Sequence, residues 1–76
     1  MSLGPLTARL FRAMADHLDD TGSAPMDEDA LDDAAKATTT SRLTAGLAAA
    51  NAPDITPGQT RGQYAERLRE AAEENT

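Results

Sequence analysis

Apolar residues recur at helical spacing along the chain, and no run alternates between apolar and polar residues as a strand would. In the first twenty residues, four apolar positions follow one another at intervals of four, with Phe11 beside them. This stripe consists of Leu6, Leu10, Phe11, Met14 and Leu18. Pro5 suits a first helical turn, and Gly22 is placed to end the helix in a left-handed cap. The pattern therefore predicts a first helix over residues 5–20.

A second helix is predicted to begin near residues 25–27, because Asp27, Glu28 and Asp29 would place negative charge in its first turn. Its apolar face is thin and consists of Leu31, Ala34 and Ala35. Threonines at 38–40 are poor inside helices but good caps, so they predict a junction to a third helix over 40–51. The stripe of that helix would be Leu43, Leu47 and Ala50. The alternative is one long helix over 27–51, bent at the threonines.

The segment Thr-Pro-Gly-Gln at residues 56–59 is the clearest local signal for a helix start. Thr56 could cap the N–H of Gln59, and proline would occupy the first helical position. These features predict a fourth helix over 57–73, with Tyr64 and Leu68 on its inner face and Ile55 packed at its start. Acidic residues at its C-terminal end oppose the helix dipole, so we expect residues 74–76 to fray.

Together these elements predict an all-α fold, a small bundle of three to four short helices formed by one domain over residues 1–76. No internal repeat and no linker divides the chain. The expected core takes the largest apolar residues of each helix. These are Leu6, Leu10, Phe11, Met14, Leu18, Leu31, Leu43, Leu47, Ile55, Tyr64 and Leu68.

Large apolar residues are scarce in this chain. Leucine, isoleucine, valine and phenylalanine together make up ten of 76 residues, whereas alanine alone makes up sixteen. Alanine favours helix but buries little surface, and the chain has no cysteine for a disulfide. We therefore expect a homo-oligomer, most simply a dimer, or a chain that folds fully only on a partner. The stripe from Leu6 to Leu18 is the candidate apolar seam for such a contact, or else plain bundle core.

The formal net charge is −6, and eight of the thirteen acidic residues fall between Asp16 and Asp33. This charge disfavours nucleic acid and anionic membranes as partners. The acidic segment is either a solvated face or a surface that docks on a basic or mixed protein partner. The candidate partner-binding residues are Asp16, Asp19, Asp20, Asp27, Asp29, Asp32 and Asp33.

Residues that carry chemistry are nearly absent. The chain has no cysteine and a single histidine, His17, with no serine in a nucleophile motif. Because the acidic residues lack the spacing of a calcium-binding loop, we expect no metal ion. Because so few residues could carry chemistry, we also expect no cofactor and no catalytic residue. No apolar run reaches the ~20 residues of a membrane span, and the N-terminus does not have the organisation of a signal peptide. A cytoplasmic location is the default expectation.

The leading hypothesis is thus a non-enzymatic acidic interaction module, such as an accessory subunit, a regulator or a small inhibitor. The alternative is a small DNA-binding regulator in which the third helix and the helix over 57–73 form a helix-turn-helix. Its candidate nucleic-acid contacts are Arg42, Arg61, Gln63 and Arg67. A simpler interpretation of the basic residues is ion pairing within the fourth helix, between Arg69 and the glutamates Glu66 and Glu73.

Overall fold

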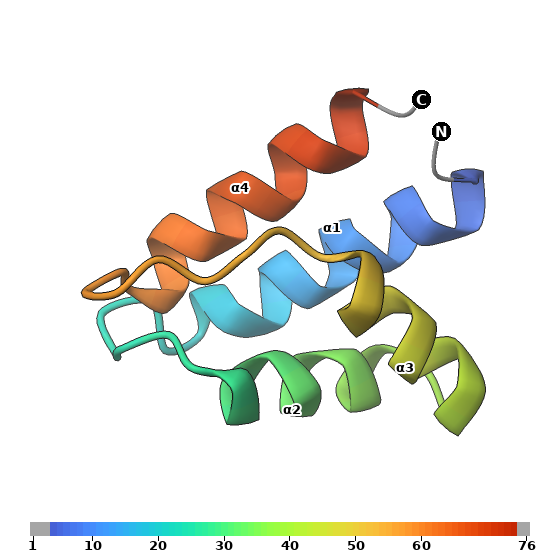
Figure 1. Ribbon diagram of the computed structural model, residues 1–76, viewed down its shortest axis with the longest axis horizontal. Helices are drawn as coiled ribbons and strands as arrows, with labels where there is room; N and C mark the ends of the chain where they lie inside the picture. The colour runs from blue at the N-terminus through green and yellow to red at the C-terminus, as the bar shows by residue number, and fades with distance from the viewer. Residues whose placement is uncertain (1–3, 75–76) are drawn as a thin grey trace.

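The computed structural model describes residues 4–74, and these form four α-helices connected by loops (Figure 1). The helices are α1 (Pro5–Asp19), α2 (Glu28–Thr38), α3 (Arg42–Asn51) and α4 (Arg61–Glu74). Within the described range there is no strand, and the only extended pairing is an isolated bridge between Pro25 and Thr60. The all-α expectation is confirmed. Glu74 is the last residue of α4, and the remaining residues predicted to fray, 75–76, lie outside the described range.

Helix α1 lies in the middle of the bundle. α4 packs along one side of it and α2 along the other, while α3 packs mainly on α2 and more narrowly on α1 (Figure 1). α2 and α3 run in opposite directions, since the start of α2 lies beside the end of α3. This arrangement leaves α3 with partners on one face only.

α2 and α3 each begin at a side-chain cap of their own. The Asp27 carboxylate accepts a hydrogen bond from the N–H of Ala30 at 2.7 Å, and the Ser41 hydroxyl accepts one from the N–H of Thr44 at 3.2 Å. Thr39 has an extended backbone, with φ of −152°. The alternative of one long helix over 27–51 is therefore wrong, because the chain turns at the threonines and a new cap begins α3.

Helix α4 begins four residues later than predicted. Gly58 has φ of +82°, a left-handed conformation that a right-handed helix does not accept, and the N–H of Gln59 donates to the Thr56 carbonyl at 3.1 Å. Residues 56–59 are thus a β-turn with proline second and glycine third. The capping box belongs to the next Thr-x-x-Gln. The N–H of Gln63 donates to Thr60 Oγ1 at 3.2 Å, and the N–H of Thr60 donates to Gln63 Oε1 at 2.9 Å.

The predicted left-handed cap at Gly22 is also wrong, because Gly58 is the only described residue with positive φ. At this position the backbone instead lies close to Gly62, at the start of α4. The N–H of Gly62 donates to the Gly22 carbonyl oxygen at 2.9 Å, and a Cβ on Gly62 would lie only 3.2 Å from that oxygen. The N–H of Arg61 likewise donates to the Ala24 carbonyl at 2.9 Å. The loop between α1 and α2 therefore satisfies N–H groups at the start of α4 that would otherwise lack partners.

Aromatic and long aliphatic side chains fill the centre of the core, and alanines fill the helix contacts around it. The largest fully buried side chains are Phe11, Met14, Leu18, Tyr64 and Leu68. Nine alanines among the described residues are also buried. Each has only one side-chain carbon, so the helices that they join can approach closely. The core prediction was correct for the largest residues of α1 and α4.

Three leucines predicted in the core are exposed instead. Leu43 is 74% exposed, Leu6 60% and Leu47 56%, whereas Leu31 and Ile55 are partly buried. Leu6 lies in the first turn of α1, whereas the exposure of Leu43 and Leu47 follows from the face that α3 presents to its neighbours. α3 buries its alanine side, with Ala45 and Ala48 as the buried residues, and its leucines point outward.

Candidate interaction surfaces

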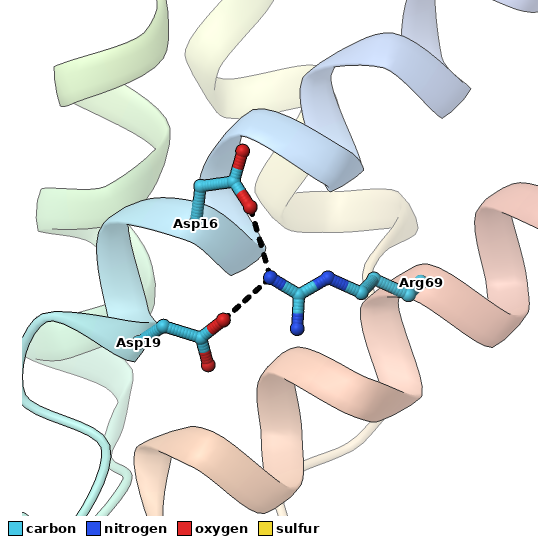
Figure 2. Close-up of polar contacts among 3 residues, drawn as sticks. All are labelled: Asp16, Asp19 and Arg69. Atoms are coloured by element: carbon cyan, nitrogen blue, oxygen red, sulfur yellow. Dashed lines mark hydrogen bonds and ion pairs between the residues drawn. The ribbon is translucent and has the colours of Figure 1, made fainter.

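The predicted acidic segment divides into two groups that lie on different helices. In the first group, on the α4 side of α1, Asp16 and Asp19 receive the guanidinium of Arg69 (Figure 2). Arg69 Nη2 lies 2.9 Å from Asp16 Oδ1 and 2.5 Å from Asp19 Oδ2. Hydrogen bonds to Asp19 and then Asp16 raise the pKa of Arg69 above its ordinary value. These two carboxylates therefore help to join α1 to α4, a contact that helical spacing alone does not predict.

The second group is a row of exposed carboxylates on α2, which we call the α2 acidic face. It consists of Glu28, Asp29, Asp32 and Asp33. The one basic residue of α2, Lys36, pairs with Asp32 at 2.8 Å, and this hydrogen bond raises the pKa of the lysine. Both side chains of the pair are more than half exposed. Within the described residues, no ion pair engages Asp29 or Asp33.

Two further predicted acidic residues lie at helix ends. Asp27 caps α2 through its carboxylate, as described above. Asp20 is the C-cap residue of α1 and is exposed. Asp27 therefore has a local structural role, whereas Asp20 remains a free candidate for contact with a partner.

The predicted apolar seam on α1 lies mostly inside the chain's own core. Of its five residues, Phe11, Met14 and Leu18 are at most 1% exposed and Leu10 is 8% exposed. Leu6 is the one member that a partner could reach in this conformation. α1 consequently contributes core packing between α2 and α4 more than it contributes surface.

The four candidate nucleic-acid contacts do not form one group. The guanidinium of Arg61 donates to the Pro25 carbonyl at 3.2 Å and to Thr21 Oγ1 at 2.9 Å, so it fastens the loop between α1 and α2. Gln63 belongs to the capping box of α4. Arg42 and Arg67 are exposed but line different hollows. In addition, α3 packs on α2 and α4 packs on α1, which is not the helix pairing of a helix-turn-helix.

The outer face of α3 is an exposed apolar surface that the sequence pattern did not predict. We use this name for its exposed positions Leu43, Gly46, Leu47 and Ala50. An open hollow of about 410 Å³ adjoins the C-terminal end of this face, and its lining includes both apolar residues and two carboxylates: Glu28, Leu31, Ala49, Ala50, Ala52, Pro53, Asp54 and Ile55. The sequence does carry a signal for this face, because the alanines at positions 45 and 48 form a second apolar stripe on α3, and the structure buries that stripe.

Within residues 4–74, His17 is exposed on α1 and no polar or charged residue is buried. The Tyr64 hydroxyl donates to the Pro53 carbonyl at 2.6 Å, and burial raises its pKa to about 12, which keeps it protonated as a structural group. Among residues 4–74 there is no group of three potential metal ligands. None of the four helices is long and apolar enough to cross a membrane.

No protein-family model, no curated protein and no solved structure matches this chain. A functional hypothesis for the protein therefore depends on its own surfaces. The two that stand out are the α2 acidic face and the outer face of α3.

Proposed function

We propose that this protein is a non-enzymatic interaction module that docks through the α2 acidic face on a basic or mixed protein surface. A role as an accessory subunit, regulator or small inhibitor would fit such a module. The observation that carries the proposal is the exposure of four carboxylates along α2 beside a single basic residue, Lys36, which pairs with only one of them. The net charge of −6 adds a long-range field of the same sign.

The arrangement of Asp29 and Asp33 gives the proposal a physical basis. They lie four residues apart on one helix face, and like charges at that spacing destabilise a helix by about 0.2–0.5 kcal/mol. Lysine or arginine side chains of a docked partner would relieve this repulsion. Complementary charge of this kind mainly accelerates association and selects the partner, and it weakens with salt.

The DNA-binding alternative has less support. Two of its four candidate residues, Arg61 and Gln63, already make contacts that hold the start of α4, and the net charge of −6 opposes approach to a phosphate backbone. Fluorescence anisotropy of labelled duplex DNA, repeated over a salt series, would test this alternative directly. We expect no binding even at low salt.

The proposal is tested by reversing charge on the α2 acidic face and comparing it with a matched control elsewhere. The variant Asp29→Lys/Asp33→Lys changes two exposed acids four residues apart on α2. The control Glu66→Lys/Glu70→Lys changes two exposed acids at the same spacing on α4, with the same change in net charge. The probe is a fluorescently labelled cationic amphipathic helical peptide, and the measurement is its association rate by stopped flow.

We expect the α2 variant to slow association about tenfold or more at low salt, because it removes the local attraction for the probe. The α4 control should slow it much less, and the difference should shrink as salt is added. Equal slowing in both variants would mean that the probe responds to net charge alone. The α2 acidic face would then have no special role, and the proposal would be wrong.

A further inference from the structure

The outer face of α3 differs in charge from the rest of the molecule. α3 contains no acidic residue, although the chain has thirteen, and its only charged residue is Arg42 at its first position. Among the described residues, Leu43 is the most exposed large apolar side chain and Leu47 is the third most exposed. Between them lies Gly46, where an added Cβ would meet nothing within 4 Å. Another helix could therefore approach closely at this glycine without a collision.

A projecting side chain and a receiving hollow lie at opposite ends of this face. Leu43 projects near the N-terminal end of α3. The hollow of about 410 Å³ lies at the other end, beside Ala50, with Leu31 and Ile55 among its lining residues. Leu43 and Ala50 are seven residues apart, which is two helical turns or roughly 10 Å on the same side of the helix. One helix face thus carries both halves of a self-complementary contact.

We infer that α3 forms a homodimer interface in which two copies pack antiparallel about a two-fold axis beside Gly46 and Leu47. This axis places Leu43 of each copy opposite Ala50 of the other. Each Leu43 then enters the hollow at the end of the other copy's α3. A two-fold interface uses the same patch on both chains, and it closes after two copies, so the expected product is a dimer.

The charges at the two ends of the face favour this orientation. The hollow is lined by two carboxylates, Glu28 and Asp54, both exposed. The antiparallel arrangement brings Arg42, the neighbour of Leu43, to that same end of the other copy. A parallel arrangement would instead place the two Arg42 side chains together. The pairing therefore joins opposite charges twice, once at each end of the interface.

A second copy of this chain explains the face better than a basic partner does. The outer face itself has no carboxylate to attract cations, and the acids that could do so lie on α2. This inference uses Glu28 of the α2 acidic face but neither Asp29 nor Asp33, whose charge reversal tests the proposed function, so the two proposals can fail separately. The contact is small, since α3 is ten residues and thus ~15 Å long, so we expect a weak dimer with a Kd of roughly 100 μM.

The test is sedimentation velocity of the full chain from about 1 μM to about 1 mM, the range in which small interfaces dissociate. We expect the 8.0 kDa monomer to convert into dimer as concentration rises. Leu43→Glu should weaken dimerisation at least about tenfold, because it removes the apolar side chain from the contact and places a carboxylate beside Glu28 and Asp54 of the other copy. The matched control is Leu6→Glu, the same change at an exposed leucine on α1, which should leave the dimer unchanged. Both sites are exposed in the monomer, so circular dichroism should show both variants folded.

A charge swap tests the antiparallel orientation. Arg42→Asp alone should weaken the dimer, and adding Asp54→Arg in the same chain should restore it to within about threefold of the original affinity. The double variant keeps the net charge of −6, so a general charge effect would not produce the rescue. Aspartate also suits the first position of a helix, so this substitution should not unfold α3. A chain that stays monomeric at every concentration, a dimer indifferent to Leu43→Glu, equal loss with Leu6→Glu, or a swap without rescue would each overturn the inference.

Discussion

The same substitution, leucine to alanine, should have very different effects at Leu68 and at Leu43. The sequence pattern places both residues in the core, whereas the structure separates them. Leu68 is 0% exposed, between α4 and α1, and Leu43 is 74% exposed on the outer face of α3. Comparing the two variants therefore tests which side of α3 the chain buries.

The magnitudes follow from the atoms removed. Leucine to alanine removes three carbons, worth about 2.4 kcal/mol of transfer free energy when fully buried. At Leu68 the cavity left behind adds to this loss, so we expect a cost of about 3–4 kcal/mol. At Leu43 about a quarter of the side chain is buried, so the loss is about 0.6 kcal/mol, partly offset by the higher helix propensity of alanine. A chain of 76 residues has a free energy of unfolding of only about 4–11 kcal/mol, so Leu68→Ala removes a large part of it.

Urea unfolding followed by circular dichroism measures both costs. It should be done at about 5 μM protein, where mass action keeps a weak dimer dissociated and the monomer alone is compared. Leu68→Ala should lower the urea midpoint by about 2 M, and Leu43→Ala should move it by less than about 0.5 M. A cost at Leu43 equal to that at Leu68 would refute the reasoning, because it would mean that α3 packs its leucines inward.

Three further predictions concern polar contacts. Arg69→Ala should lower the free energy of unfolding by about 1 kcal/mol at low salt and by less at about 1 M salt, because the ion pairs of Arg69 with α1 are partly exposed. Urea midpoints at both salt concentrations measure this difference. Tyr64→Phe should cost about 1 kcal/mol by leaving the Pro53 carbonyl without its donor. The fold raises the pKa of Tyr64 from 10.0 to about 12, so the stabilising effect of its hydroxyl is full below pH 10 and is lost as the pH rises towards 12. Urea unfolding across this pH range should show that loss of stability in the unsubstituted chain and not in Tyr64→Phe. Thr60→Ala should cost about 1 kcal/mol as a lost cap and Thr56→Ala clearly less, as thermal melts of the two variants would show.

Local signals in the sequence identified the elements well, because each helix has its own residues that start and stop it. The first helix was predicted to within one residue, since Pro5 and the four-residue apolar spacing both act locally. The start of α4 was missed for a reason that is also local. Two Thr-x-x-Gln segments follow one another, and the first contains Gly58, whose left-handed backbone makes it a turn. Only the second forms the capping box.

Contacts between helices were much harder to predict. The pairing of Arg69 with Asp16 and Asp19 joins residues 50 or more positions apart, and helical spacing carries no information about such contacts. The division of the acidic segment into two groups has the same origin. It depends on α4 covering one side of α1 while α2 covers the other, and the linear charge pattern does not contain that arrangement.

The inversion of α3 shows how alanine content can decide which face of a helix is buried. A helix with a leucine stripe and an alanine stripe can bury either one. Burying the leucines removes more apolar surface, but it also holds the neighbouring helix farther away. α2 also buries alanines, Ala30, Ala34 and Ala35, so both helices carry buried small side chains that suit dense packing. That choice leaves Leu43 and Leu47 at the surface of a chain already poor in large apolar residues. A second copy of α3 would cover them and would place Arg42 of each copy beside Glu28 and Asp54 of the other.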